Sequence, residues 1–323
     1  MNKDIRNKIS QLGEKYGATG QDLMSYLDGL LYADYLSYWD YIHLDTLLSL
    51  QSPKTDFPDE NIFIIYHQIT ELYFKLIIHE LEQITNNGRH VLASGEDLGW
   101  KKNLEINFFI ERLQRIIRYF ENLVKSFDVM ISGMDKKEFL RFRMALLPGS
   151  GFQSIQFRLI EIYSTNFENL CTSKENLNKK ENFLEKIYWQ SGATELKTKK
   201  KTYTLTQFNR KYQDLLFSKK KDLKSKNIYK KFNSINQKTP KINTLKNLLK
   251  RYDLLVNVHW KLAHYKSAIK YLKKEHGDIK ATGGTNWKKY LPPRFQKIIF
   301  FPKLWSKKEK ENWGMSWVLE NYK

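Results

Sequence analysis

The sequence predicts an all-α fold, a single-domain multi-helix bundle over residues 1–323, and three observations support it. The chain of 323 residues contains only seven prolines, so long segments run without a residue that breaks helices. In several of these segments apolar residues recur every three or four positions, which is the period of a helix with one buried face. The alternation typical of β-strands is scarce, and residues 202–205 offer only a short example.

Three long helices account for most of the predicted bundle. Their apolar residues are Ile62, Ile65, Ile69, Leu72, Leu76, Ile77 and Leu81 in the first, Phe108, Ile110, Leu113, Ile116, Ile117, Phe120 and Leu123 in the second, and Leu254, Val258, Leu262, Tyr265, Ile269 and Leu272 in the third. The sequence has no internal repeat and no linker rich in Gly, Pro or Ser. One domain is therefore the simplest architecture.

Between residues 169 and 248 the sequence becomes polar and rich in lysine, and we expect a smaller helical insertion over about residues 172–250. Lys and Arg total 55 against 35 Asp and Glu, a formal net charge of +20. Such an excess suits a nucleic acid or another anionic partner as well as a solvated surface. The solvated surface is favoured, because the sequence has no glycine-rich phosphate loop, zinc-finger spacing or RNP-like aromatic strand.

Other features of the sequence favour a cytoplasmic protein without a membrane partner. The first six residues lack the apolar run of a secretory signal. No stretch approaches the roughly 20 apolar residues of a membrane helix. The lone cysteine, Cys171, excludes an intramolecular disulfide and a cysteine-based zinc cluster.

Two loops rich in glycine and hydroxyl side chains are candidate ligand-binding elements. Residues 147–151 read Leu-Pro-Gly-Ser-Gly and should end the helix that carries Arg143, since proline and two glycines do not continue a helix. Residues 281–285 read Ala-Thr-Gly-Gly-Thr. Both loops can close over a ligand and offer backbone N–H groups, although an ordinary surface turn can have the same composition.

Two histidines lie on apolar faces of the predicted helices. His67 shares a helix stripe with Phe63 and Phe74, and such a histidine is more often a packed core residue than a functional one. His264 lies beside Trp260 and several small residues that leave room for a flat group. This setting suits an axial ligand of haem iron, and it also suits helix packing. The other histidines form no set with metal-ligand spacing.

Arg143 lies in a run of apolar residues that extends from Phe139 to Leu147. Its guanidinium needs an anion or water there. A planar guanidinium commonly binds a carboxylate through two parallel hydrogen bonds. A structural ion pair would satisfy it equally well. Arg141 points elsewhere on the helix and is expected to be solvated. No G-x-S-x-G motif supports a nucleophilic serine, and Cys171 has no neighbouring motif.

Together, these segments resemble the signatures of the tryptophan 2,3-dioxygenase family. Residues 59–75 resemble D-E-x-x-F-I-x-x-H-Q-x-x-E-L-W-x-K, residues 142–158 resemble F-R…P-x-S-G-F-Q-S-x-Q-[FY]-R, residues 260–264 match W-x-x-x-H, residues 282–285 match T-G-G-[ST], and residues 38–45 resemble Y-x-x-Y-L-x-L-D. The motifs occur in the family's order over roughly residues 20–305. The departures from the family pattern are Phe139, Tyr73, Ile42 and Ala281, where members often carry tyrosine, tryptophan, leucine and glycine.

The resemblance implies a haem enzyme that cleaves the indole C2–C3 bond of L-tryptophan with O2 and gives N-formylkynurenine. The cofactor would be haem b, ferrous in the active state, with His264 as the iron ligand. Further cofactor contacts implied by the family are Trp260, Ser150 and Gly151. The catalytic residue would be His67, which orients the indole N–H rather than acting as an obligatory base. The implied substrate contacts are Phe63, His67, Phe139, Arg143 on the carboxylate, Thr282 on the ammonium group, and Tyr38 and Tyr41.

The same resemblance implies a homotetramer in which an N-terminal helical segment, residues 20–50, reaches a neighbouring subunit. Two other functions stay open at this point. One is a family relative that oxygenates another aromatic substrate, such as a modified indole or tyrosine. The other is a basic helical nucleic-acid-binding protein with a decayed haem site. The presence of His67, Arg143 and Thr282 together favours a free amino acid as substrate over a bare indole.

Overall fold

The computed structural model describes residues 2–33, 37–88, 103–146, 153–173, 180, 182–190, 193, 201–273, 288 and 291–315. Over these ranges the regular structure is helical, and β-pairing is limited to an isolated bridge between Cys171 and Ile187. The predicted all-α class is therefore confirmed. The chain forms two compact units, Met1–Ser52 and Pro53–Lys323.

The N-terminal unit consists of α1 (Lys3–Ala18), α2 (Leu23–Tyr32), α3 (Tyr38–Tyr41) and α4 (Leu44–Leu48). Asp22 caps α2, because its carboxylate accepts hydrogen bonds from the backbone N–H groups of Met24 and Ser25. None of these four helices contains a buried residue, and Leu30 and Leu31 of α2 are 73% and 74% exposed. Within its described residues this unit has no hydrophobic core of its own.

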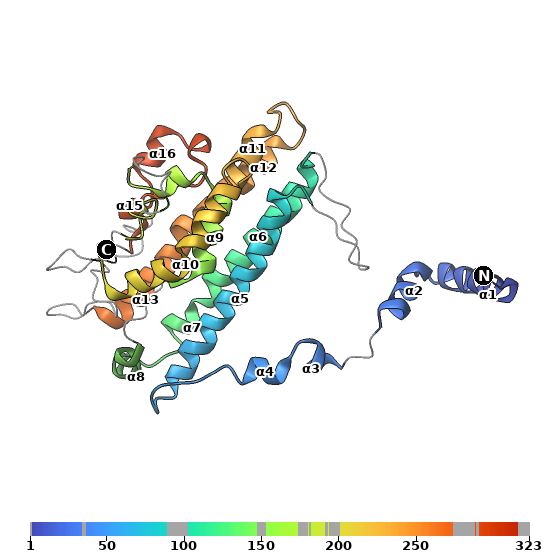
Figure 1. The fold of residues 1–323 in the computed structure, drawn as a ribbon, viewed down its shortest axis with the longest axis horizontal. Helices are drawn as coiled ribbons and strands as arrows, with labels where there is room; N and C mark the ends of the chain where they lie inside the picture. Colours follow the sequence, from blue (N-terminus) through green and yellow to red (C-terminus); the bar gives the residue numbers. More distant parts are fainter. Residues whose placement is uncertain are drawn as a thin grey trace. The chain divides into compact units, whose positions relative to one another are not determined.

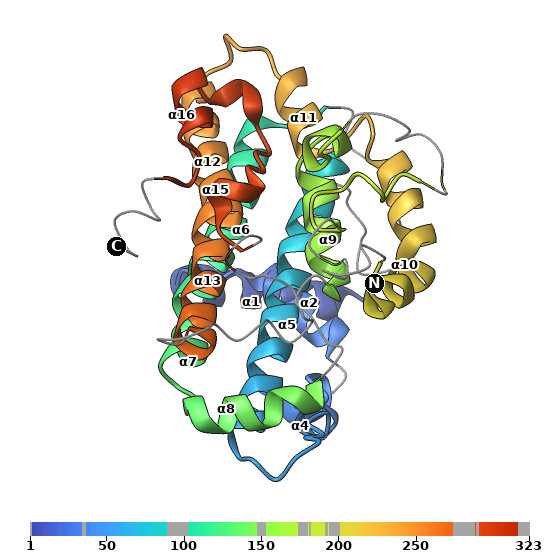
Figure 2. The same ribbon diagram turned by 90° about the vertical axis from the view of Figure 1, so that its left-hand side faces the viewer.

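The larger unit is a bundle built around α5 (Asp59–Thr85), α6 (Ile106–Ser126), α9 (Ile155–Ser164), α12 (Ile242–Leu254) and α13 (Trp260–Leu272). Helix α5 packs against α6 and α9, and α6 packs in turn against α12 (Figures 1 and 2). One face of α6 is apolar and buried, formed by Phe109, Ile110, Leu113, Ile116, Ile117, Phe120 and Leu123. The helices predicted around residues 62–81 and 108–123 are both confirmed, as α5 and α6.

The buried face of α5 is not its aliphatic stripe. Side chains of this stripe are each 42–49% exposed: Ile65, Ile69, Leu72 and Leu76. The neighbouring stripe is buried instead, and its Phe74 ring lies 5.5 Å from that of Phe157 on α9 and 6.5 Å from that of Phe120 on α6. Apolar spacing therefore predicted the helix, whereas its packing partners determine which face is covered.

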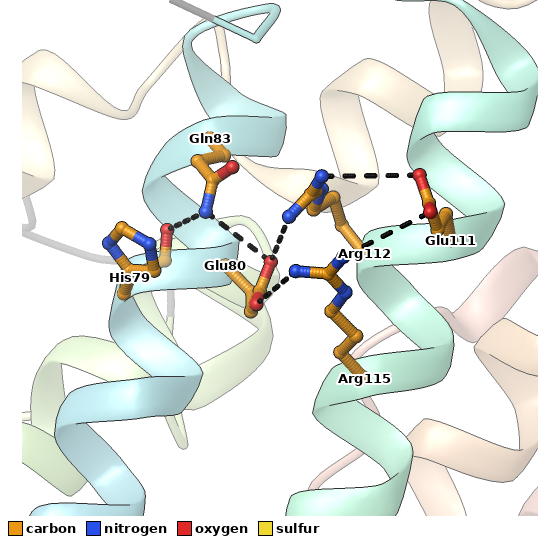
Figure 3. A network of polar contacts seen from close by, with 6 residues as sticks. All are labelled: His79, Glu80, Gln83, Glu111, Arg112 and Arg115. Atoms are coloured by element: carbon orange, nitrogen blue, oxygen red, sulfur yellow. Dashed lines mark hydrogen bonds and ion pairs between the residues drawn. The ribbon is translucent and has the colours of Figure 1, made fainter. Parts of the chain in front are cut away.

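A polar network joins α5 to α6 (Figure 3). Glu80 of α5 is buried, and its carboxylate lies 3.3 Å from Nη1 of Arg112 and 3.4 Å from Nη1 of Arg115, both on α6. The side-chain amide of Gln83 donates to the same carboxylate, and Glu111 contacts both arginines. A buried carboxylate held by two cations sets the register between these two helices, because a shift would leave its charge unpaired.

A second, more deeply buried charged cluster joins α9 to α13. Nη1 of Arg158 lies 2.9 Å from Oε2 of Glu161, and the Tyr188 hydroxyl donates to Oε1 of Glu161. Lys261 of α13 is 7% exposed, and its Nζ lies 4.8 Å from the centre of the Tyr188 ring. This Nζ has no hydrogen-bond partner in the described part of the chain. Burial lowers the pKa of Lys261 to about 7, although the charge of Glu161 opposes that effect.

The third predicted helix, around residues 254–272, is interrupted. Helix α12 ends at Leu254, the π-helical turn η5 (Leu255–His259) follows, and α13 begins at Trp260. Three further elements lie near the C-terminal end of the described chain: α15 (Pro293–Gln296), η6 (Pro302–Leu304) and α16 (Lys307–Glu311). A π-helical turn inside a longer helix often marks a functional site.

The lysine-rich region 172–250 contains α10 (Tyr203–Asp222), α11 (Ile228–Ser234) and the first part of α12. Helices α10 and α11 both pack against α9 (Figure 2). The residues of α12 within this region belong to the main bundle, since α12 packs on α6. In the described ranges, every helix is too short or too polar to cross a lipid bilayer.

Candidate active site

His264 lies on the second turn of α13 with its imidazole orientation defined by a backbone hydrogen bond. Its Nδ1 lies 3.0 Å from the carbonyl oxygen of Trp260, so Nδ1 carries the proton and donates. The rings of Trp260 and Phe127 each lie 4.6 Å from the His264 ring. Their desolvating effect lowers the pKa of His264 to about 4. At neutral pH the imidazole is therefore uncharged, and Nε2 keeps its lone pair.

His67 on α5 has the same arrangement. Its Nδ1 lies 2.7 Å from the carbonyl oxygen of Phe63 and donates to it, while the Phe63 ring lies 4.1 Å from the imidazole. Desolvation by the surrounding protein lowers the pKa of His67 below its ordinary value, even though its side chain is exposed. Because the pKa lies below its ordinary value, the ring is uncharged near neutral pH, and its Nε2 is free of a proton and can accept a hydrogen bond.

The two histidines belong to one site. Tyr66 lies 5.9 Å from the His67 ring and 5.6 Å from Phe127, which in turn lies 4.6 Å from His264. A positive charge on His67 would lower the pKa of His264 further, as expected of neighbouring groups. Helices α5 and α13, together with Phe127 at the end of α6, bring together residues that are 197 positions apart in sequence (67 and 264).

Arg143 approaches this site from a separate helical segment. Helix α8 (Lys136–Phe142) ends at Phe142, and Arg143 begins the 3-10 turn η1 (Arg143–Leu146). The helical segment that carries Arg143 thus runs to Leu146, directly before the loop at 147–151, and its last turn tightens into 3-10 geometry, as helix ends often do. Arg143 is 4% exposed, and desolvation lowers the pKa of its guanidinium. Arg141 is exposed, as predicted, with its guanidinium over the Phe57 ring.

Aromatic rings connect Arg143 to His67. Phe142, which precedes Arg143 in the chain, lies 5.9 Å from Phe63, and Phe139 lies 6.5 Å from Phe63. Phe139 also lies 4.4 Å from the ring of Tyr271 on α13. Asp59 at the start of α5 accepts a 2.6 Å hydrogen bond from the backbone of Asp135, which caps α8, so the two helices are held together at this end. The result is an apolar wall beside a buried cation.

The residues around His264 fit a haem. A single imidazole supplies one ligand, which would suit an iron that a porphyrin already holds. The hydrogen bond from Nδ1 to a backbone carbonyl is the usual way in which a metal-binding histidine is oriented and made more basic. The depressed pKa of His264 keeps Nε2 available for iron at neutral pH. Ala263 and Ala268 on the same helix have small side chains.

A family model described as tryptophan 2,3-dioxygenase matches residues 28–273. The chain belongs to the tryptophan 2,3-dioxygenase family. This confirms the resemblance carried by the motifs, over a range close to the one expected from them.

Individual relatives match a shorter segment. The tryptophan 2,3-dioxygenase of Ruegeria sp. (strain TM1040) is 44% identical over 130 residues, which cover 40% of this chain and 42% of that protein. The protein of the same name from Bradyrhizobium diazoefficiens is 40% identical over 126 residues, 39% of this chain and 40% of the relative. The one from Aedes aegypti is 39% identical over 133 residues, 41% of this chain and 31% of the relative. The match thus covers about two-fifths of the length of the Ruegeria and Bradyrhizobium proteins.

Five residues that the family resemblance assigns to the site lie outside the described residues or in the N-terminal unit. Thr282, Ser150 and Gly151 lie outside the residues that the structure describes. Tyr38 and Tyr41 lie in α3 of the N-terminal unit, where their side chains are 71% and 74% exposed. The structure therefore brings together five of the predicted residues: Phe63, His67, Phe139, Trp260 and His264, with Arg143 adjoining them.

Sequence reasoning missed three residues of this family member's site. Tyr66 and Phe127 connect the two histidines; Tyr66 occupies a variable position of the motif at residues 59–75, and Phe127 lies outside every motif. Gln156 donates through Nε2 to both the backbone and the carboxylate of Glu71 at 2.8 Å, which ties the start of α9 to α5 one turn after His67. Gln156 was within a recognised motif and could have been singled out there, whereas Phe127 carried no local signal.

Proposed function

We propose that this chain is a haem-dependent dioxygenase that cleaves the C2–C3 bond of the indole of L-tryptophan with O2 and gives N-formylkynurenine. One observation carries the proposal. His67 and His264 share an aromatic site, and each donates from Nδ1 to its own helix, so each offers a neutral Nε2 to a ligand. The relatives named tryptophan 2,3-dioxygenase support the same reaction.

His264 would hold the iron of haem b, with Trp260 and Phe127 packed against its imidazole. Ser150 and Gly151 are proposed as further contacts on the grounds of family resemblance alone. When bound in the ferrous state, the haem supplies the activation of O2. The protein supplies a neutral ligand, a defined ring orientation and an apolar surrounding that lowers the local dielectric.

His67 would position the substrate. Because its Nδ1 proton is already donated to Phe63, Nε2 can accept the indole N–H of tryptophan. Its depressed pKa keeps the ring uncharged, so it accepts rather than donates near neutral pH. Cleavage of the indole double bond needs no strong protein base. His67 therefore acts by orienting the indole at this atom, which holds the reacting bond in one place.

Arg143 would bind the substrate carboxylate. Arg143 is buried and directly follows Phe142, whose ring contacts those of Phe63 and Phe139; a cation close in sequence to this aromatic group matches an amino acid with a charged end and an aromatic end. A planar fork forms two parallel hydrogen bonds to a carboxylate, and these bonds strengthen where water is excluded. Thr282 is proposed to take the ammonium group, on the grounds of the motif resemblance.

We further propose a cytoplasmic homotetramer in which residues 20–50 reach a neighbouring subunit, where Tyr38 and Tyr41 would contact the substrate. Two observations support an assembly. The N-terminal unit exposes apolar side chains without a core, and α5 exposes its aliphatic stripe. Contiguous exposed apolar surface of this kind is typical of protein interfaces. Sedimentation at several concentrations would measure the subunit number.

To test the enzymatic proposal, the reduced, haem-loaded protein is incubated with tryptophan and O2. The absorbance of N-formylkynurenine then measures the product formed. Tryptamine, which lacks the carboxylate, should be a poor substrate. Arg143→Lys keeps the positive charge but loses the planar guanidinium that can make two parallel hydrogen bonds. Arg143→Ala should lower kcat/KM for tryptophan by an amount equivalent to about 2–5 kcal/mol. Arg141→Lys, at the exposed neighbouring arginine, is the matched control. Absence of product from the wild-type protein, or equal turnover of tryptamine and tryptophan, would overturn the proposal.

A further inference from the structure

The π-helical turn η5 lies immediately before the helix that carries His264. In an α-helix each residue advances the side-chain direction by about 100°. A π-helical turn holds more residues than an α-helical turn, so the side chains that follow it are rotated relative to the register of the preceding helix. The direction in which His264 points, relative to the buried face of α12, therefore depends on the turn Leu255–His259.

Asp253, in the last turn of α12, is the centre of the contacts that surround this turn. Its side chain is fully buried. Its Oδ1 accepts from the backbone N–H of Phe300 at 3.0 Å, and Oδ2 accepts from the backbone N–H of Phe301 at 3.1 Å and from the indole Nε1 of Trp305 at 2.9 Å. Three donors from one distant segment thus converge on a single carboxylate.

The fourth donor comes from the π-turn itself. Asn257, in the middle of η5, is 1% exposed and donates through Nδ2 to Oδ1 of Asp253 at 2.8 Å. The carboxylate therefore connects the inside of the π-turn to residues 300–305. The same segment also packs on α13 through a small apolar cluster in which Trp305 and Trp313 meet Val258 and Leu262. Leu262 is two residues from His264, so the segment supports the iron-ligand helix directly.

We propose that Asp253 is a positioning residue for the iron ligand: it holds the π-turn, through Asn257 and the 300–305 segment, in the geometry that sets the orientation of His264. The part of this inference that concerns iron rests on the proposed haem function. A fully buried carboxylate is a costly choice for stability alone, since an apolar group of similar size often serves as well. The four donors that converge on Asp253 fix one arrangement of the π-turn and the 300–305 segment. Apolar packing alone would not fix a single arrangement.

The experiment compares Asp253→Asn with the wild-type protein and with Glu80→Gln, a matched control. Glu80 is also a buried carboxylate bound by several donors, but among the described residues its hydrogen bonds and ion pairs go to α5 and α6 alone (Figure 3). Both variants change a carboxylate to an amide of the same shape. Asn257→Ser is the second variant, because it removes the link to the π-turn and leaves the bonds from Phe300, Phe301 and Trp305 to Asp253 in place.

The first readout uses the haem-free protein. The ring protons of His264 lie within the ring-current fields of Trp260 and Phe127, each 4.6 Å away, so their NMR shifts report the orientation of the imidazole. We expect Asp253→Asn and Asn257→Ser to move the His264 signals and Glu80→Gln to leave them in place. His264 signals that coincide in all four proteins would overturn the inference, whether or not the chain binds haem.

The second readout uses the haem-loaded protein. The iron–histidine stretching band should shift or broaden in Asp253→Asn and Asn257→Ser. Haem loss to an acceptor protein should be roughly 10–100-fold faster, the range usual for a residue that orients a metal ligand. Equal loss rates in Asp253→Asn and Glu80→Gln would overturn the role toward iron. If the wild-type protein shows no iron–histidine band, the haem proposal fails, and the His264 NMR shifts still decide whether Asp253 positions the ring.

Discussion

Replacing Lys261 with methionine should make the protein more stable near neutral pH, although the substitution removes a charge from a charged cluster. Lys261 is 7% exposed, and within the described chain its Nζ makes no hydrogen bond. Glu161 keeps two closer partners without it, because Nη1 of Arg158 lies 2.9 Å away and the Tyr188 hydroxyl donates to the other oxygen. Methionine has a similar length and no charge to desolvate.

The magnitude follows from the pKa of Lys261, which burial lowers from 10.5 to about 7. At 1.36 kcal/mol per pH unit, this difference corresponds to an upper bound of about 5 kcal/mol. Above pH 10.5 the amine is neutral in both the folded and the unfolded chain, so it has no effect. Between pH 10.5 and 7 only the unfolded chain binds the proton, so the stability of the wild-type protein falls as the pH falls. Buried ions replaced by apolar groups commonly yield about 1–4 kcal/mol, and we expect that range at pH 7.

The assay is urea unfolding of the wild type and Lys261→Met at pH 7 and at pH 10, with equal slopes required for the comparison. The difference in free energy of unfolding should be largest at pH 7 and small at pH 10. Lys266→Met, at an exposed lysine on the same helix, should change stability by less than about 0.5 kcal/mol at both pH values. A destabilised Lys261→Met protein at pH 7, or a gain of equal size at both pH values, would refute the reasoning.

Three further outcomes are expected. His264→Ala should abolish the histidine-ligated Soret spectrum, and added imidazole should restore it; an unchanged spectrum would contradict the ligand assignment. Because desolvation lowers the pKa of His67, kcat/KM for tryptophan should fall only at pH values below 6.5, where the ring gains its proton. A pH–rate profile with its acid limb centred above 6.5 would exclude this. Glu80→Ala should cost about 3 kcal/mol in urea unfolding, at the lower end for a broken buried pair because Arg115 is partly exposed; a cost below 1 kcal/mol would mean that the network is not cooperative.

The sequence predicted that the long helices exist more reliably than it predicted how they pack. Apolar spacing located α5 and α6, since a one-sided helix must repeat every three or four residues. It did not distinguish the exposed stripe with Ile69 and Leu72 from the buried one with Phe74, because both are apolar and only the tertiary partners differ. The π-turn Leu255–His259 was missed for a related reason, since Leu255, Val256, Asn257 and Val258 are all buried and carry no breaker.

The candidate site was predictable where a motif carries the residue itself. His67, His264 and Arg143 were singled out from their motifs, and the structure places the two histidines in one aromatic site with Arg143 beside it. The contact between Phe127 and His264 was not predictable. It depends on where α6 ends relative to α13, and no local sequence pattern encodes the distance between these two helices. The electrostatic state of His264 was also invisible in sequence, since its low pKa is caused by desolvation from neighbouring segments.

Both histidines are oriented by a carbonyl four residues earlier on their own helix, Phe63 for His67 and Trp260 for His264. Every amino acid provides that carbonyl, so no substitution at position 63 or 260 removes the acceptor while the helix persists. A point mutation at position 63 or 260 therefore leaves the proton of the imidazole on Nδ1. Substitutions at these two positions change only the side chain that packs against the imidazole. Phe63 and Trp260 can therefore be replaced without disturbing the chemistry of the histidine next to them.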